Sequence, residues 1–259
     1  MISAFTQSNI DINTLYIYPP ESVENYANKL LLLWKALYSL NPNISTIKSL
    51  IEELKYFFKL KDLGVIKDYL GIEIDYNRDQ GYMKLYQASY IEKVLARFDL
   101  SDYKPKNTPM DSKVKLEPNP NKATKEDISW FQQVIGCLQF LTLATRPNIS
   151  YAIIELARFS SNPSDTHILA AKNVLRYLKG SIKLGLVYIN SSSKYVSGYC
   201  DSDYTGDIST AKSTSGYSFY IGSCLFSWKS KLQSIIAQST IEAEYIAINS
   251  AVKEAVYIR

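Results

Sequence analysis

Residues 194–204 read K-Y-V-S-G-Y-C-D-S-D-Y, and the part of the chain that they open decides the fold. Residues 195–200 alternate in the manner of a β-strand, so the pattern predicts a strand here. This strand would deliver Asp201, Asp203 and Asp207 at its end or just beyond it. Carboxylates in such a place can face both solvent and a metal ion.

Two further strands follow in the sequence. Residues 216–221 and 225–229 are short runs of aromatic and β-branched side chains. Gly222 and Ser223 lie between them, which predicts a tight hairpin. With the strand before them, they predict three antiparallel strands.

The hydrophobic period changes after the third strand. Ser239 and Thr240 precede a segment rich in alanine, glutamate and isoleucine, which is typical of a helix N-terminus. The apolar residues that recur on one face of this helix are Ile241, Tyr245, Ile248 and Val252. Asp201 on the first strand and Glu244 in the first turns of the helix could therefore reach one metal ion.

Other acidic residues are interpreted as ordinary polar surface. We expect Asp203, Asp207 and Glu242 to be solvated. Glu73 and Asp75 alternate with apolar residues in a predicted antiparallel hairpin, so we expect them on its polar face. The hairpin is predicted over residues 72–76 and 81–87.

The composition excludes few binding partners, but it excludes most kinds of catalysis that depend on histidine. The chain has 259 residues, 46% of them hydrophobic, which is long enough for one large or two small globular domains. A net charge of +4 permits nucleic-acid binding without demonstrating it. The single histidine, His167, excludes most histidine-based catalysis and is interpreted as a packing or capping residue. No small-molecule substrate is evident.

The cysteines and the apolar runs indicate a reduced, intracellular setting, cytoplasmic or nuclear. Cys137, Cys200 and Cys224 are odd in number and lack C-x-x-C spacing, so neither a disulfide framework nor a zinc knuckle is indicated. No signal-peptide pattern starts the chain, and the most apolar run, residues 134–144, is too short to span a bilayer. We therefore expect no membrane partner.

The middle of the chain predicts helices. Residues 130–144 form a strongly apolar helix, a second helix starts near Pro147, and a third covers residues 165–179, closed by Gly180. Residues 101–127 are rich in proline, lysine and asparagine, and we interpret them as a linker.

One face of the third helix is basic. Lys172, Arg176 and Lys179 lie opposite its apolar residues. Such a face can follow the phosphates of a nucleic acid, or it can be an ordinary solvated surface. The sequence leaves both interpretations open.

The C-terminal motifs resemble the ribonuclease H domain of copia-type retrotransposon polyproteins. They are G-Y-C-D-S-D-Y at 198–204, S-T-S-G-Y at 213–217, S-W-K-S-K at 227–231 and S-T-I-E-A-E-Y at 239–245. The resemblance implies that Asp201 is the metal ligand on the first strand and Glu244 the ligand on the helix. It also implies hydrolysis of the RNA strand of an RNA/DNA hybrid with two ions, Mg²⁺ or Mn²⁺.

Earlier motifs resemble the reverse transcriptase of the same polyproteins. They include W-K-A-L-Y-S-L at 34–40, Y-L-G-I-E-I at 69–74 and Y-I-E-K-V-L-A-R-F at 90–98. R-P-N-I-S-Y-A at 146–152, in the predicted helices that follow, is a further signature of the copia-type polyproteins. In that family an aspartate often stands where Asn148 stands here. The first palm aspartate and the Asp-Asp hairpin of the polymerase have no counterpart in this sequence, so the resemblance implies no DNA synthesis.

The expected fold class is α/β, in the sense of separate helical and antiparallel parts (α+β). The expected domains are a reverse-transcriptase fingers/palm remnant (1–45), a palm hairpin, thumb start and linker (46–127), a helical connection (128–190) and the N-terminal half of a ribonuclease H-like domain (191–259).

The expected function follows from this arrangement. We expect a truncated and internally deleted polyprotein remnant, in which further acids that the family needs fall beyond Arg259. Its inherited chemistry would be hybrid hydrolysis, with little or no activity in the chain as written. The alternatives are a non-catalytic nucleic-acid-binding protein and a fragment without function.

Overall fold

The computed structural model describes residues 49, 52, 56, 66–77, 79–111, 116–190, 195–207 and 209–258. The chain divides into two compact units, and residues 67–259 form the unit that holds nearly all of the described residues. The motifs expected before residue 45 lie outside the described part. Before residue 66, only Ser49, Glu52 and Tyr56 are described, and all three are helical.

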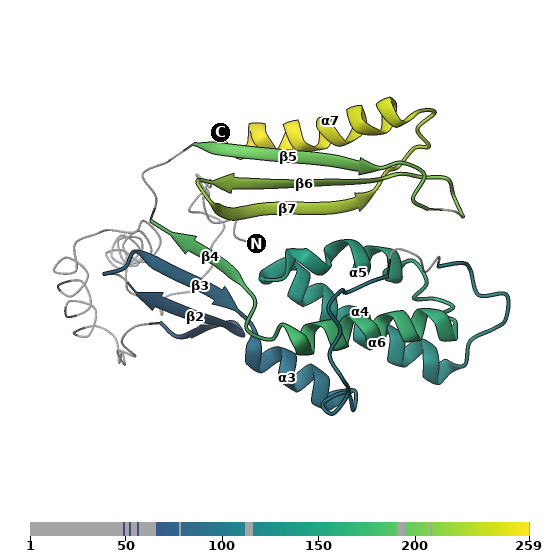
Figure 1. The fold of residues 1–259 in the computed structure, drawn as a ribbon, viewed down its shortest axis with the longest axis horizontal. Helices are drawn as coiled ribbons and strands as arrows, with labels where there is room; N and C mark the ends of the chain where they lie inside the picture. The colour runs from purple at the N-terminus through teal and green to yellow at the C-terminus, as the bar shows by residue number, and fades with distance from the viewer. Residues whose placement is uncertain are drawn as a thin grey trace, which may run out of the picture. The chain divides into compact units, whose positions relative to one another are not determined.

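The first sheet of this unit is antiparallel, in the order β1-β2-β3-β4 (Figure 1). Its strands are β1 (Asp68–Tyr69), β2 (Ile72–Asn77), β3 (Tyr82–Tyr86) and β4 (Leu186–Ile189). The predicted hairpin is confirmed, with Ile74 opposite Leu85. Glu73 accepts a hydrogen bond of 2.6 Å from the backbone N–H of Ser89, so this acid helps to hold the start of the next helix.

A helical layer follows and contains the main core. The helices are α3 (Ala88–Arg97), α4 (Lys125–Ala144), the 3₁₀ turn η3 (Pro147–Ile149), α5 (Ser150–Ala157) and α6 (Asp165–Gly180). Buried side chains from these four α-helices meet here, among them Ile91, Phe131, Leu138, Leu156 and Leu175. The helix expected over 130–144 begins earlier, because the side chain of Thr124 accepts the backbone N–H of Asp127 and caps it.

The segment expected to be a linker packs against this layer instead. Met110 and Leu116 lie partly buried against the helical core. The backbone N–H of Lys106 donates to the carbonyl of Arg176, and Asn162 donates to the carbonyl of Asn119. Hydrogen bonds to exposed backbone thus hold a stretch whose apolar content is low.

The second sheet confirms the three predicted strands. It has the antiparallel order β5-β6-β7, with β5 (Val196–Asp203), β6 (Thr214–Ile221) and β7 (Cys224–Leu232). The hairpin between β6 and β7 turns at Gly222, whose φ of 60° is a conformation that glycine adopts without strain. Helix α7 (Thr240–Ile258) packs on β5 and β6, as Figure 1 shows.

Helix α7 turns a different face to the sheet from the one its apolar pattern indicates. Its buried residues are Ala243, Ala247 and Ala251. The predicted apolar face is exposed, with Ile241, Tyr245, Ile248 and Val252 between 43% and 68% accessible. Alanines allow the helix backbone to lie close to the sheet, and this close approach decides which face is buried.

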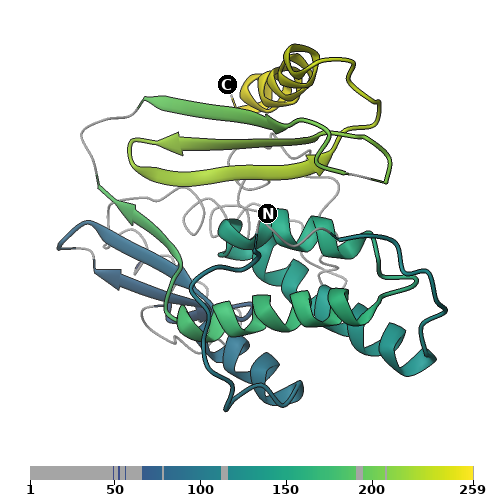
Figure 2. The same cartoon turned by 45° about the vertical axis from the view of Figure 1, so that its right-hand side comes forward.

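The other face of the second sheet turns toward the helical layer (Figure 2). Strand β7 contacts α5 and β4, and the indole N–H of Trp228 donates to the carbonyl of Thr142 at 2.9 Å. In the described part of the chain, no helix is both long enough and apolar enough to cross a membrane. The α/β fold class with separate antiparallel sheets is confirmed.

Among the described residues, Arg146 is the largest fully buried side chain. Its guanidinium donates to Asn148 Oδ1 at 3.1 Å and to the carbonyl and hydroxyl of Ser181, and it lies over the ring of Tyr177. Burial lowers the pKa of Arg146, an effect that the nearby Tyr177 partly opposes. The side chains that these contacts bring to the buried cation are neutral.

We predict that Asn148→Asp stabilises the protein. Asn148 is exposed, so a carboxylate there loses little hydration, and its hydrogen bond with the buried guanidinium becomes an ion pair. The expected gain is about 1–2 kcal/mol of unfolding free energy, measured by urea denaturation at neutral pH. Asn249→Asp, at an exposed position on α7, is the matched control and should change stability little. A loss of stability in Asn148→Asp would show that Arg146 needs no anion.

Candidate active site

Two acids of strand β5 share one face of the second sheet. The hydroxyl of Tyr151 on α5 donates to Asp203 Oδ2 at 3.1 Å, so Asp203 points toward the helical layer. Asp201 precedes it by two residues and therefore faces the same way. In the ladder with β6, Asp201 lies opposite Gly216 and Asp203 opposite Thr214.

Helix α7 covers the opposite face of the sheet. Ser227 donates to Glu254 of α7 at 2.6 Å, and Gln233 donates both to Ser215 and to the carbonyl of Ala243. Ser215 alternates with Thr214 along β6, so it lies on the face away from Asp203. The two faces of the sheet thus have different neighbours.

The predicted acids consequently lie on different elements, with Asp201 beside Asp203 on β5 and Glu244 on α7. The described residues contain no group of three or more histidine, cysteine, aspartate or glutamate side chains that could hold a metal ion. By themselves they do not form the complete two-ion site that the resemblance implies. The pairing of Asp201 with Glu244 stays a prediction.

A cleft of about 500 Å³ opens in front of the two aspartates. Its lining comes from β5, β6, β7, η3 and α5, and includes Tyr151, Asp201, Asp203, Thr214, Ser218 and Trp228. Burial, followed by the charge of Asp203, raises the pKa of Tyr151 to about 12, so its hydroxyl keeps the proton that it donates. Two carboxylates and several hydroxyl groups thus line the cleft, together with Lys229.

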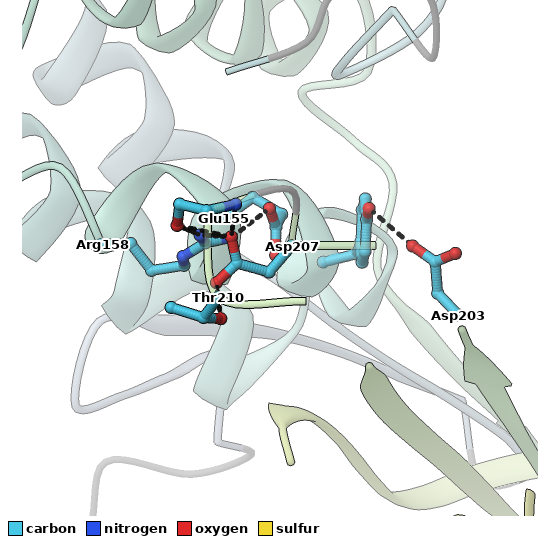
Figure 3. A network of polar contacts seen from close by, with 7 residues as sticks. Glu155, Arg158, Asp203, Asp207 and Thr210 are labelled. Atoms are coloured by element: carbon cyan, nitrogen blue, oxygen red, sulfur yellow. Dashed lines mark hydrogen bonds and ion pairs between the residues drawn. The ribbon is translucent and has the colours of Figure 1, made fainter. Parts of the chain in front are cut away.

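Asp207 is buried, which overturns the expectation that it is a solvated acid. Only 1% of its surface is accessible, and it forms an ion pair with Arg158 at the end of α5 (Figure 3). It also accepts hydrogen bonds from Ser209 and Thr210. Burial alone would raise the pKa of Asp207, but the bonds from Thr210, Ser209 and Arg158 outweigh it and lower the pKa to about 2.

Arg158 also pairs with Glu155, one turn earlier on α5, at 2.8 Å. Burial raises the pKa of Glu155, and Arg158 opposes this shift. Arg158 therefore holds two carboxylates, one on its own helix and one in the loop between β5 and β6 (Figure 3). The sequence offered only the proximity of an arginine to a helix end as a signal for this network.

The start of α7 confirms the predicted N-terminal signal. Ser239 Oγ accepts the backbone N–H of Glu242 at 3.1 Å, and the Glu242 carboxylate accepts the backbone N–H of Gln238 at 2.7 Å. This reciprocal arrangement satisfies donors that a helix start leaves open. Glu242 is thus a capping residue, whereas we expected only solvation.

The basic residues of α6 bind the protein's own backbone. Arg176 donates to the carbonyl of Lys104 at 2.7 Å, and Lys179 donates to the carbonyls of Ser101 and Tyr103. The Lys172 ammonium lies 5.5 Å from the centre of the Trp130 ring. These contacts give the three cations a structural use, and their binding to nucleic acid stays a prediction.

His167 is a capping and packing residue, as predicted. The backbone N–H of Ser164 donates to its Nδ1 at 2.9 Å, and its ring stacks on Phe159 with centroids 3.9 Å apart. The side chain is fully buried, and this burial lowers its pKa. His167 therefore fixes the start of α6.

Comparisons with known proteins find similarity to a reverse transcriptase family and to transposon Pol polyproteins. Residues 40–112 match the family described as reverse transcriptase (RNA-dependent DNA polymerase). The chain is 35% identical, over 94% of its length, to the Retrovirus-related Pol polyprotein from transposon TNT 1-94 of Nicotiana tabacum. It is 34% identical, over 80% of its length, to the corresponding polyprotein from transposon RE1 of Arabidopsis thaliana. These matches span 19% and 14% of the two polyproteins.

A shorter relative matches along most of its length. The uncharacterized mitochondrial protein AtMg00810 of Arabidopsis thaliana is 37% identical over 78% of this chain and 82% of the relative. No solved structure matches the chain.

We predict that Asp207→Asn lowers stability at neutral pH by about 2–3 kcal/mol, because it removes one of the two carboxylates that hold the partly buried Arg158. The pKa of Asp207 is depressed, so its stabilisation is present above about pH 4 and is lost as the pH falls toward 2. Urea denaturation at pH 7 and pH 3 should therefore show a smaller difference between variant and wild type at pH 3. Asp102→Asn, at an exposed position, is the control, and an equal loss at both pH values would contradict the ion-pair explanation.

Proposed function

Because the chain belongs to the family of copia-type retrotransposon Pol polyproteins, we propose that β5–β7 and α7 form part of a ribonuclease H-like lobe. The inherited reaction is two-metal hydrolysis of the RNA strand of an RNA/DNA hybrid. Asp201 and Glu244 are the acids proposed for it, with Mg²⁺ or Mn²⁺ as the ions. The chain alone cleaves little or no hybrid.

The observation that carries this proposal is the position of Asp201. It is exposed near the end of a strand, beside a second aspartate, and it lines a cleft large enough for a phosphodiester group and its waters. The order of three antiparallel strands followed by a helix that bears Glu244 supports the same lobe.

The low activity follows from charge. Two divalent ions about 3.5–4 Å apart repel each other strongly, so several carboxylates must surround them. The described residues bring no three acidic, histidine or cysteine ligands together. Acids from other parts of a Pol polyprotein would therefore be needed to complete the site.

We predict that the chain cleaves an RNA/DNA hybrid weakly or not at all in Mn²⁺, and that adding the C-terminal region of a family polyprotein restores cleavage. The extended protein with Asp201→Asn should lose this activity by at least about a hundredfold, because one ion would lose a negatively charged ligand. Product formation on a labelled hybrid measures all three proteins.

The extended protein with Asp102→Asn is the matched control for that assay, since this exposed acid lies outside the lobe. Robust cleavage by the unextended chain would contradict the argument that two ions need more carboxylates than this chain supplies. Full activity in the extended Asp201→Asn protein would show that Asp201 is not the first acid. Hybrid binding without cleavage by either version would leave a non-catalytic nucleic-acid-binding protein as the function.

The proposed partner is an RNA/DNA hybrid or another nucleic acid, bound through phosphates. Lys172, Arg176 and Lys179 keep their positive charge while they hold backbone carbonyls or lie over a ring. Their common helix face can therefore still attract a polyanion. Because the same side chains support residues 101–104, a variant must be checked for folding.

We predict that hybrid affinity falls steeply with salt concentration, and that removing all three charges flattens the slope of log affinity against log salt by about two to three units. Fluorescence anisotropy at several salt concentrations measures the slope, and circular dichroism confirms that the variant remains helical. The matched control is a second triple variant, which neutralises three exposed lysines on other helices: Lys93, Lys125 and Lys253. An unchanged slope in the α6 variant would make this face a structural surface only.

A further inference from the structure

We propose that the open edge of strand β5 is a dimerisation surface, at which a second copy of this chain pairs its own β5 in the antiparallel direction. This pairing joins two three-stranded sheets into one continuous sheet around a two-fold axis. Such a dimer is independent of the proposed nuclease function, because neither an ion nor a nucleic acid takes part in the contact.

One side of β5 lacks a strand partner. Among the described strands, β5 pairs with β6 alone. The carbonyl of Tyr195 accepts the backbone N–H of Gly222, just after the end of β6, so Tyr195 directs its backbone groups toward β6. The backbone groups of successive residues point to alternate sides of a strand. The residues whose N–H and C=O groups point to the open edge are therefore Val196, Gly198, Cys200 and Ser202.

The open edge is accessible and unprotected. All residues of β5 are exposed apart from Ser202, which is half-buried. A row of unpaired N–H and C=O groups is a template for another strand, and proteins commonly protect such edges with lysine, proline or a β-bulge. Strand β5 contains neither lysine nor proline, and its ladder with β6 is regular. Its two charged residues, Asp201 and Asp203, lie at one end.

The sequence of β5 is complementary to itself in one antiparallel register. The outward-facing residues overlap fully with those of a second copy when Tyr199 lies opposite the Tyr199 of that copy. Ser197 then lies opposite Asp201 of the second copy. Tyr195 lies opposite Asp203, so hydroxyl groups face carboxylates at both ends of the pairing. Because a register centred on Asp201 would place like charges opposite each other, the acids favour the central register.

The side chain at the centre of this register is suited to such a contact. Tyr199 is 68% exposed and lies edge-to-face with Tyr220, with ring centroids 6.0 Å apart. In the central register the two Tyr199 residues form a non-hydrogen-bonded pair, in which side chains approach each other most closely. Each ring would thus gain an aromatic neighbour across the edge, and aromatic cross-strand pairs stabilise a sheet.

Helix α7 adds apolar surface beside the same edge. It packs on β5 and β6, and Figures 1 and 2 show it running along β5. A two-fold axis perpendicular to the joined sheet places both α7 helices on the same face of that sheet. The exposed apolar side chains that the dimer gathers on this face are Ile241, Tyr245, Ile248 and Val252. Contiguous apolar surface of this kind is typical of protein–protein contacts.

The exposed area is sufficient for a stable dimer, in which each partner commonly buries about 800 Å². Tyr195 is 85% exposed, and Tyr199 and Tyr245 are each 68% exposed. A large aromatic side chain buries about 150–250 Å², so these three could contribute roughly 300–550 Å². The backbone of β5 and the remaining apolar residues of α7 supply further area. The edge and the helix together therefore match an ordinary dimer interface in size.

The oligomeric state of the full chain tests this surface. Sedimentation velocity over a range of protein concentrations should show a monomer–dimer equilibrium. Cys200→Pro removes one outward N–H at a place where an edge strand tolerates proline, and it should raise the dimer dissociation constant by at least about tenfold. Cys200→Ala keeps the N–H, so this matched control should dimerise like the natural chain.

A disulfide crosslink tests the register. The background is Cys200→Ser, because the natural cysteine is exposed. Adding Tyr199→Cys should give a covalent dimer under mild oxidation, since the Cβ atoms of directly opposed residues lie about 4.5–5.5 Å apart. Adding Ser197→Cys instead should give little, because the two thiols would be offset by roughly 13 Å along the strands. The background variant alone shows how much crosslinking the other cysteines cause.

A monomer at every concentration would overturn the inference, as would equal crosslinking at positions 197 and 199. Unchanged dimerisation in a folded Cys200→Pro protein would exclude the β5 edge, and circular dichroism reports whether that variant is folded. If it is not, the crosslinking pair still decides. A chain that stays monomeric but binds the C-terminal region of a family polyprotein would assign the edge to that region instead. Hybrid cleavage by the extended protein is a separate measurement, so failure of the dimer leaves the proposed function untouched.

Discussion

The ion pair between Arg158 and Asp207 joins helix α5 to the loop that follows β5. The position of the sheet face that bears Asp201 and Asp203 depends on this ion pair. The loop carries the chain from β5 to β6, so fixing it also fixes the strand end that bears Asp203. A buried ion pair contributes less to net stability than its Coulomb energy suggests, because both charges lose hydration. Its larger effect here is to select one arrangement, since breaking it would leave a charge buried.

Helix α5 contacts the acidic strand through one stripe of its surface. Tyr151, Glu155 and Arg158 are spaced by four and three residues, so they lie on the same face of the helix. Tyr151 binds Asp203, and Arg158 binds both Glu155 and Asp207. One short helix of the connecting layer thereby orients the acids of the second sheet, and the sheet and the helical layer belong to a single compact unit.

On its opposite face, the second sheet packs against the alanines of α7. Small side chains allow close approach but bury little apolar area, which leaves the larger apolar residues of the helix exposed. Strand β5 pairs only with β6 among the described strands and is exposed along most of its length. The lobe therefore presents an open strand edge and an apolar helix face side by side.

The sequence alone determined the local elements and the family. Alternation identified the strands at 195–200, 216–221 and 225–229, Ser239 identified the start of α7, and the order of the motifs identified the copia-type polyproteins. These signals are local, because strand alternation, turn residues and helix caps act within a few positions of the chain.

Only the tertiary structure decided how these elements use their side chains. In the folded chain, Asp207 is buried in an ion pair with Arg158. Arg176 and Lys179 donate hydrogen bonds to backbone carbonyls of residues 101–104, and the alanines of α7 pack against the sheet. In each case the partner lies far away in the sequence, where no periodic pattern reports on it. Whether a charge is solvated or buried depends on which distant surface covers it, and that is a property of packing.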